Sequence, residues 1–598
     1  MFTTRPELHG TFGAVASTHW LASAAGMAVL ERGGNAFDAA VAAGFVLQVV
    51  EPHLNGPGGE VPIVFHDVKS GDTRIVCGQG PAPAGATIDH YRSQGLDLVP
   101  GSGLLATVIP GAFDAWMLML RDYGTLPLSE VLSYAIGYAE QGCPLATMIP
   151  LTIERVEELF RTEWPTSATV FLPNGQVPKA GQIFKNPAMG STYRRIVEEA
   201  EAASGDRQEQ IQAARRIWSQ GFVAEEVERF ALNNELMDAA GGRRRGVITA
   251  GDMASWQASY EEPVTYDFHG YRVCKGGPWS QGPVHLQQLA LLKGFDLTAI
   301  PYDGPDFIHT VIECAKLAFA DREAYYGDPN FVEVPLDTLL SDSYNDARRA
   351  LVGAQASHAL QPGEIEGYQV EIAHLGAERG DKGEFDALGG GEPTMQVGGQ
   401  TGTQRGDTCH VDVIDRWGNM VGATPSGGWL QSSPVIPALG FCLNSRAQMF
   451  WLEEGLPASL EPGKRPRTTL SVNLVLREDE PYMVYGTPGG DYQDQWTIAV
   501  FLRHVIHGLN LQEAIDSAAF QTDHMPSSFW PREAKLGSLS VEDRLPAATI
   551  EELRRRGHLV DVLDSWSLGR VSATARELDG LIKAAANPRL MQGYAICR

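Results

Sequence analysis

Apolar residues recur at helical spacing through much of the first two thirds of the chain. This spacing predicts amphipathic or alanine-rich helices over Asp114–Tyr123, Leu128–Gln141, Ala224–Asn233 and Asp306–Tyr325. The run Ala36–Val50 is apolar on nearly every side, so it predicts a buried helix, with Asn35 as its N-cap and Pro52 beyond its end. We therefore expect this part of the chain to be mostly helical.

The pattern changes near Thr408. Alternating or short apolar runs predict strands over Cys409–Asp415, Met420–Thr424, Leu470–Leu476 and Tyr482–Gly486. Turn-forming residues between the first two runs indicate a hairpin. Helical spacing returns over Gln495–His507, Leu511–Phe520 and Ala547–Arg556. Strands in two layers, covered by helices, are the packing that these elements favour.

A glycine-rich stretch between Gly376 and Gly406 runs directly into this strand region. It has hardly any apolar periodicity, which indicates a flexible tether. On local pattern alone, the stretch is a linker between domains, and Thr408 is an ordinary β-branched residue at the start of a strand.

Composition and charge narrow the function classes. An apolar content of 43% with 65 glycines is typical of a large globular α/β protein. The formal net charge of -26 argues against nucleic-acid and anionic-membrane partners, which are held by clustered Lys and Arg. The seven cysteines include no C-x-x-C pair and predict neither a disulfide framework nor a zinc site, so we expect a reducing cytoplasmic location. No secretory signal is expected, and Ala36–Val50 is shorter than the ~20 residues of a membrane span.

Several motifs, in a fixed order, carry a resemblance to a known family. They are the run Gly33–Pro52, N-G-P-G-G at Asn55–Gly59, Pro110-Gly111, DYGTLPL from Asp122, FADREAYYGDP from Phe319, DTCHVDVID from Asp407, KRPRTTL from Lys464 and TPGG from Thr487. With these motifs the chain resembles the γ-glutamyltranspeptidase family of N-terminal-nucleophile (Ntn) hydrolases along nearly its whole length.

The resemblance implies a four-layer αββα fold and a self-cleaving precursor. Cleavage between Asp407 and Thr408 is expected to give a large fragment, 1–407, and a small fragment, 408–598. The two fragments would stay associated in one composite domain. The glycine-rich stretch then becomes a segment that must be free to leave.

The family also implies roles for individual residues. Thr408 matches the nucleophile, and its new α-amino group, with a reference pKa of ~7.7 to 8, would serve as general base. Thr424 matches a threonine that supports the nucleophile's oxygen, and Gly489 and Gly490 match the pair whose N–H groups form the oxyanion hole. Cys409 and His410 are interpreted as structural, because adjacent strand residues point to opposite faces. No cofactor and no metal are implied.

The substrate pocket departs from the family pattern. Thr468 and Thr469 replace paired serines that contact the substrate carboxylate, and Ile88 stands where the family has a carboxylate-binding arginine. In Leu443–Phe450, Met449 replaces an acid that holds the α-amino group and Arg446 replaces a glutamine, while Arg467 replaces an apolar residue. The two arginines are either substrate ligands or members of salt bridges.

These differences favour an amidohydrolase that forms an acyl-Thr408 ester from an amide whose acyl group has an anionic end, such as a glutaryl- or oxamate-like group. One alternative is a true γ-glutamyl hydrolase or transpeptidase acting on glutathione. Another is a non-catalytic binding protein of the same fold. The expected partners are a small-molecule amide and the other fragment of the same chain. Whether the processed unit forms a homodimer is left open.

Overall fold

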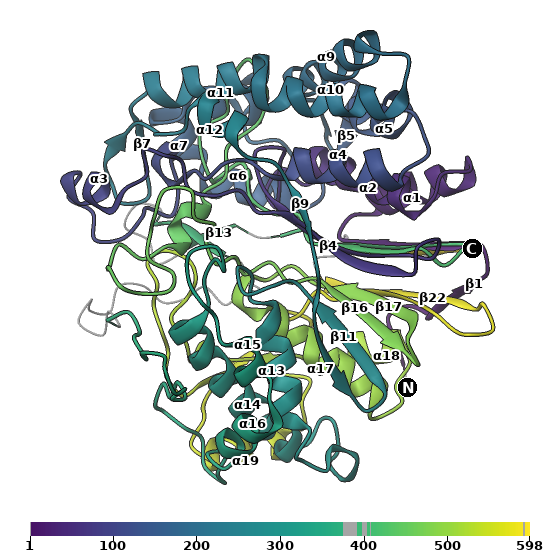
Figure 1. Cartoon of the computed structure of the whole chain (residues 1–598), viewed down its shortest axis with the longest axis vertical. Helices are drawn as coiled ribbons and strands as arrows, with labels where there is room; N and C mark the ends of the chain where they lie inside the picture. The colour runs from purple at the N-terminus through teal and green to yellow at the C-terminus, as the bar shows by residue number, and fades with distance from the viewer. Residues whose placement is uncertain (1, 375–391, 397–402, 407, 590–592) are drawn as a thin grey trace.

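The computed structural model describes residues 2–374, 392–396, 403–406, 408–589 and 593–598. Two antiparallel seven-stranded sheets lie face to face at the centre of the molecule, and helices cover the outer side of each sheet (Figure 1). Small apolar residues such as Ala16, Val64 and Val484 fill the space between the sheets. This is the four-layer αββα architecture that the sequence predicts.

The first sheet carries the chain that follows Thr408. Its strand order is β23 (Tyr594–Cys597), β2 (Gly13–Ser17), β14 (Val411–Asp415), β15 (Met420–Ala423), β3 (Val61–Asp67), β4 (Asp72–Gly78) and β9 (Ser259–Glu261). Strands β14 and β15 form the predicted hairpin, in which Val411 pairs with Ala423. β14 begins three residues after Thr408, so Thr408 lies just before the strand rather than at its start.

The second sheet contains β17, the strand that leads into the glycine motif. Its strand order is β1 (Leu8–Gly10), β22 (Ile582–Ala586), β21 (Ser572–Arg576), β17 (Glu480–Gly486), β16 (Asn473–Arg477), β11 (Tyr271–Lys275) and β10 (Val264–Phe268). Each sheet combines strands from before and after Thr408. The two parts of the chain are therefore interleaved.

One helical layer covers the first sheet and consists of segments from the first half of the chain. Its main helices are α1 (Trp20–Glu31), α2 (Ala36–Val50), α4 (Ala112–Tyr123), α5 (Leu128–Gln141), α9 (Pro187–Ala203), α10 (Arg207–Gln220) and α11 (Phe222–Asn233). Helix α2 is buried along its whole length, and the Asn35 side chain caps it by accepting from the N–H groups of Phe37 and Asp38. No helix in the described ranges combines the length and the hydropathy of a bilayer-crossing segment.

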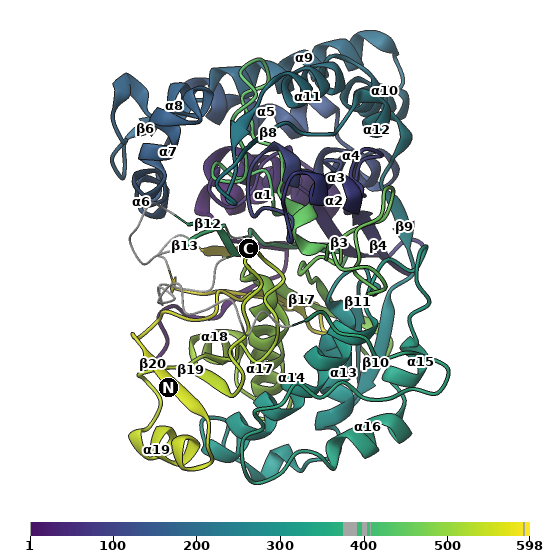
Figure 2. The same ribbon diagram turned by 90° about the vertical axis from the view of Figure 1, so that its left-hand side faces the viewer.

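The opposite helical layer packs on the second sheet. It contains α13 (Gly282–Leu292), α14 (Pro305–Tyr325), α16 (Asp342–Arg349), α17 (Gln493–Val505), α18 (Leu511–Asp516) and α19 (Ala547–Arg555). Figure 2 shows the two helical layers on opposite sides of the sheets. Short elements near the site are the helix α3 (Ile88–Ser93) and the single 3-10 turns η4 (Arg446–Met449) and η5 (Gly490–Tyr492).

Helices predominate in the first two thirds of the chain, as expected, but the sequence did not predict its strands. The region supplies seven strands of the two large sheets. Val61–Asp67 shows why, because its first six residues are all buried and it therefore lacks the alternation that predicts a strand. The glycine-rich stretch is also partly regular, since β12 (Glu392–Gln396) pairs with β13 (Thr403–Gly406). The predicted cleavage residue Asp407 lies outside the described residues.

Candidate active site

Thr408 is fully buried and lies just before β14, an interior strand of the first sheet. It forms an isolated antiparallel bridge with Ser426, just beyond the end of β15. The hydroxyl oxygens of the two residues are 3.1 Å apart, within hydrogen-bond distance. The hydroxyl that the structure places beside Thr408 Oγ1 is therefore that of Ser426, a residue for which the sequence predicted no role.

A buried ion pair lies directly behind Ser426. Arg446 donates from Nη2 to Ser426 Oγ and from Nε to Glu60 Oε1. Its guanidinium also lies over the rings of Trp429 and Phe529, 5.1 and 5.7 Å from their centroids. Burial raises the pKa of Glu60 to about 7, against the opposing charge of Arg446. Arg446 thus reaches the Thr408 site as expected, but a carboxylate of the protein already pairs with it.

Thr424 and His410 form a second buried chain of contacts. Thr424 Oγ1 is 2.9 Å from His410 Nδ1, and His410 Nε2 is 2.7 Å from Asp412 Oδ1. Burial raises the pKa of Asp412, although His410 opposes this shift. Ser572 donates to the other oxygen of Asp412 at 2.9 Å. Since the hydrogen bond of Thr424 leads to His410, its support of Thr408 remains a prediction.

Cys409 points away from this chain of contacts. Its thiol donates to Glu51 Oε2 at 2.9 Å and lies 3.1 Å from Asn55 Nδ2. Cys409 and His410 therefore contact different parts of the interior, as expected for neighbours in an extended segment.

Gly489 and Gly490 form a tight turn after β17. Their φ angles are 130° and 56°, which L side chains rarely adopt, and a Cβ on Gly489 would lie 2.3 Å from the Trp496 ring. Within the part of the chain that the structure describes, neither N–H group donates a hydrogen bond. Gly486 at the end of β17 lies against His410, since a Cβ there would be 2.3 Å from His410 Cε1. The turn is thereby held near the Thr408 segment, with two backbone donors unused.

Gln281 connects this turn to the predicted substrate-binding threonines. The backbone of Thr468 accepts from Gln281 N at 2.9 Å and donates to Trp279 O at 2.8 Å. The side chain of Gln281 donates to Gly490 O at 3.2 Å. Thr468 and Thr469 are both buried. The structure therefore brings the threonine pair and the glycine pair together.

Arg467 belongs to a buried arginine cluster, which we define as Arg322, Arg467 and Arg532 with Glu323 and Asp491. Arg467 Nη1 is 2.9 Å from Glu323 Oε1, and Arg322 pairs with Glu323 at 2.7 Å and with Asp491 at 2.5 Å. Burial opposes ionisation of the acids, but the arginines hold the pKa of Glu323 and of Asp491 below their ordinary values. Three cations face two carboxylates, so the arginine cluster has a surplus of one positive charge.

Arg532 is the member of the arginine cluster with unused donors. Its Nη1 donates to the carbonyl oxygens of Gln448 and Ser528, both at 3.1 Å, and its guanidinium lies 3.7 Å from the Trp451 ring centroid. Nε and Nη2 are buried and have no hydrogen-bond partner in the described ranges. Burial, and then repulsion from Arg467, lowers the pKa of Arg532 to about 9. Nothing in the sequence around this residue indicated a role.

The two positions that lost charged family residues are apolar and close to η4. Met449 is fully buried at the end of this turn. Ile88 begins α3, is half-buried and packs on the apolar cluster that contains Ala447 and Phe450. Neither Ile88 nor Met449 can offer a charge to a ligand, whereas Arg446 occupies the first position of η4.

The four-layer fold, with a buried threonine at the start of a central hairpin and a glycine turn after β17, is typical of an Ntn-type acyl-transfer enzyme. The sequence model of the γ-glutamyltranspeptidase family matches residues 22–597. The chain therefore belongs to the γ-glutamyltranspeptidase family, and it is a threonine-nucleophile amidohydrolase or acyltransferase.

Curated relatives match the chain over nearly their full lengths. The glutathione hydrolase-like YwrD proenzyme of Bacillus subtilis is 29% identical, with 97% of each chain covered. The acylase ACY 1 proenzyme of Pseudomonas sp. (strain V22) is 30% identical, with 96% of this chain and 92% of the relative covered. The oxamate amidohydrolase proenzyme of Klebsiella pneumoniae is 29% identical, with 97% of each covered. Relatives with nearly the same sequence identity to this chain are thus named for different activities.

Solved structures support the same fold. The structure of LmbA2991HD is 54% identical, with a TM-score of 0.93 and 100% of each chain covered. The cephalosporin acylase of Bacillus halodurans is 27% identical and superimposes with a TM-score of 0.81. The match covers 100% of this chain and 98% of the acylase chain.

Proposed function

We propose that this protein is made as a precursor that cleaves itself before Thr408 and then hydrolyses amides whose acyl group has an anionic end and no α-amine. This proposal rests chiefly on the balance of charges among the buried side chains of the site. The arginine cluster has one surplus cation, whereas Glu60, Glu323 and Asp491 are each paired with an arginine.

The chemistry follows from the residues around Thr408. Once the chain is cut, the free α-amino group takes the hydroxyl proton while Oγ1 bonds to the substrate carbonyl carbon. The N–H groups of Gly489 and Gly490 are the donors available for the negative oxygen of the tetrahedral intermediate, and one such donor is typically worth ~3 kcal/mol. The C–N bond then breaks and the departing amine receives the proton. Water then attacks the acyl-Thr408 ester, and the α-amino group of Thr408 accepts a proton from this water. The acid is released, and Thr408 is free again.

Precursor cleavage is supported by the proenzyme names of relatives that match the whole chain. We expect purified protein to run under denaturing conditions as two bands, with about two thirds and one third of the chain. N-terminal sequencing of the smaller band should begin at Thr408. Thr408→Ala should leave one band and no amide hydrolysis, because both reactions need the hydroxyl. A wild-type protein that is active as one uncut polypeptide would overturn this assignment.

Substrate selection is proposed to rest on Arg467 and Arg532 rather than on Arg446. Arg446 is paired with Glu60 and donates to Ser426, whereas two buried donors of Arg532 have no hydrogen-bond partner among the residues that the structure describes. A carboxylate that reached these donors would gain charge-assisted hydrogen bonds and balance the surplus cation. A glutaryl- or oxamate-like acyl group brings such a carboxylate. The oxamate amidohydrolase among the relatives is consistent with this class.

A panel of p-nitroanilides would test this selection. Glutaryl-p-nitroanilide should be hydrolysed with a higher kcat/KM than γ-glutamyl-p-nitroanilide. Arg467→Met and Arg532→Met should each lower kcat/KM for the glutaryl compound by about tenfold to a hundredfold, a loss typical of one charge-assisted contact. Butyryl-p-nitroanilide, which has no carboxylate, is the matched control and should respond little to either variant.

The γ-glutamyl alternative has one specific observation in its favour. Glu60 Oε2 is buried and has no hydrogen-bond partner within the described residues, so this oxygen is available to an ammonium group. If that alternative is correct, γ-glutamyl-p-nitroanilide should be turned over at least as well as the glutaryl compound. Glu60→Gln should then impair the γ-glutamyl reaction selectively. That result would replace our proposal with the glutathione-type activity.

A further inference from the structure

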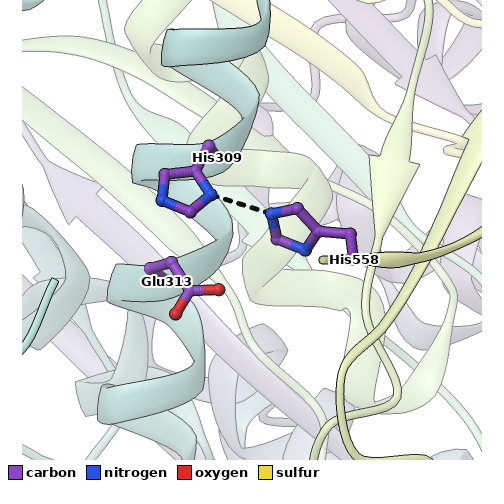
Figure 3. Close-up of side chains that lie close together, drawn as sticks. All are labelled: His309, Glu313 and His558. Carbon is purple, nitrogen blue, oxygen red and sulfur yellow. Dashed lines mark hydrogen bonds between the residues drawn. The ribbon is translucent and has the colours of Figure 1, made fainter. Parts of the chain in front are cut away.

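Two histidines and a glutamate meet in the interior, far along α14 from the arginine cluster. His309 and Glu313 are four residues apart on α14 and therefore share one face of the helix. His558 follows α19. Their ligand atoms all lie within 4.8 Å of one another, and all three residues are buried. Figure 3 shows the hydrogen bond that joins the two imidazole rings, with the Glu313 carboxylate beside them.

The hydrogen bonds of His309 fix where its ring carries hydrogen. Nε2 lies 2.8 Å from the carbonyl oxygen of Gly353, which can only accept, so this nitrogen is the donor. Nδ1 of the neutral ring therefore has a lone pair, directed at His558 Nε2 at 2.8 Å. Histidines that bind metals commonly donate their second N–H to a carbonyl in this way. His309 is thus already oriented as a ligand through Nδ1.

His558 cannot satisfy both of its nitrogens in the metal-free chain. If its Nε2 donates to His309, its Nδ1 keeps a lone pair, and that atom is buried without a partner in the described ranges. If the hydrogen moves to Nδ1, two lone pairs face each other between the rings. A cation between the rings removes this second conflict. The pair therefore favours a positively charged ligand.

Glu313 supplies the anionic group, but a lysine competes for it. Its Oε1 accepts from Lys316 Nζ at 2.6 Å and its Oε2 accepts from Ser357 N at 3.0 Å. Each carboxylate oxygen has two lone pairs, so these bonds orient the group and leave capacity for a metal. Lys316 already neutralises Glu313, however. A divalent ion must therefore bind against a buried positive charge, which limits its affinity.

We propose that His309, Glu313 and His558 bind one transition-metal ion and that Zn²⁺ fits this set of ligands best. Two imidazoles and one carboxylate form a ligand set that Zn²⁺ takes at tetrahedral sites when a water molecule supplies the fourth ligand. Arg322 lies thirteen positions after His309 on α14, which is about 20 Å at the usual helical rise. The ion would therefore have a structural role. Since α14 precedes Thr408 and His558 follows it, the site would fasten the two parts of the chain together.

The test uses full-length protein without a histidine tag, stripped with a chelator. Calorimetric titration with ZnCl2 should show one equivalent bound, Co²⁺ should give the visible absorption of a tetrahedral complex, and Zn²⁺ should raise the Tm. Glu313→Gln and His558→Gln should each lose this one equivalent. His358→Ala removes a nearby exposed histidine and should keep it. Hydrolysis of the preferred amide should be the same with and without Zn²⁺.

Lys316→Met separates a metal site from a plain hydrogen-bonded cluster. Removing the competing ammonium should tighten Zn²⁺ binding by about tenfold or more, whereas a cluster that binds no metal would show no response to Zn²⁺. If Glu313→Gln does not fold, His558→Gln and Lys316→Met decide the question. The proposal is overturned if neither wild type nor Lys316→Met binds one equivalent, or if His558→Gln binds as wild type does.

Discussion

At the scale of single residues, Ser426 contacts the predicted nucleophile although the family pattern assigns it no role. Ser426 Oγ lies 3.1 Å from Thr408 Oγ1, whereas Thr424 Oγ1 is bonded to His410. We expect Ser426→Ala to lower kcat by about tenfold to a hundredfold, because the Thr408 oxygen loses a positioned partner. Thr424→Val, which keeps the side-chain shape, should cost less once the chain is cut. Both variants need single-turnover kinetics on fully processed protein. A larger loss in Thr424→Val would support the family assignment of Thr424 instead.

The sequence predicted roles for several residues but not the residues that they contact. Thr408, Gly489 and Gly490 stand in contiguous motifs, so their roles can be predicted from a single chain. Arg446 also came from a motif, but its role depends on Glu60, which is far away in the sequence and pairs with it only in the fold. Arg532 had no local signal at all. Arg532 became a candidate because its Nε and Nη2 groups are buried without a hydrogen-bond partner in the described part of the chain. Only the packing in the fold produces this situation.

At the scale of elements, glycines inside helices show where packing overrides helix propensity. Gly44 in α2 lies against Trp116, and a Cβ there would be 2.5 Å from the indole ring. Gly44→Ala gains ~1 kcal/mol in propensity but should lose more by overpacking, for a net destabilisation of about 1 to 2 kcal/mol. Gly137→Ala in α5 is the matched control, since nothing lies within 4 Å of the added methyl. It should stabilise by up to ~1 kcal/mol. Denaturant unfolding of both would measure the difference, and equal effects would contradict the packing argument.

Helices were predicted better than strands, for a physical reason. The predicted bounds of α2 and α5 agree with the structure, because a long run with clear caps specifies a helix locally. The predicted helix Leu511–Phe520 is too long, since α18 ends at Asp516 and Phe520 begins β18 (Phe520–Gln521). Buried strands such as β3 depend on neighbours from distant parts of the chain, so no local pattern identifies them.

At the scale of the whole molecule, the sheets explain how two fragments can remain one protein. In the first sheet, β14 pairs with β2 on one side and β15 pairs with β3 on the other. In the second, β11 pairs with β16 and β1 pairs with β22. Separating residues 1–407 from 408–598 would break backbone ladders in both sheets and expose the apolar layer between them. Cleavage before Thr408 should therefore change connectivity without releasing either fragment.

We expect the processed protein to elute as one species in native gel filtration and to unfold in a single cooperative transition. Thr408→Ala, which stays uncut, is the matched control and should unfold at a similar or higher denaturant concentration, because its linked chain gains less entropy on unfolding. Residues 408–598 expressed alone should not fold, since β14 and β15 would lack their partners in the first sheet. If the fragments separated without denaturant, or the small fragment folded alone, the composite domain would in fact be two domains that merely associate.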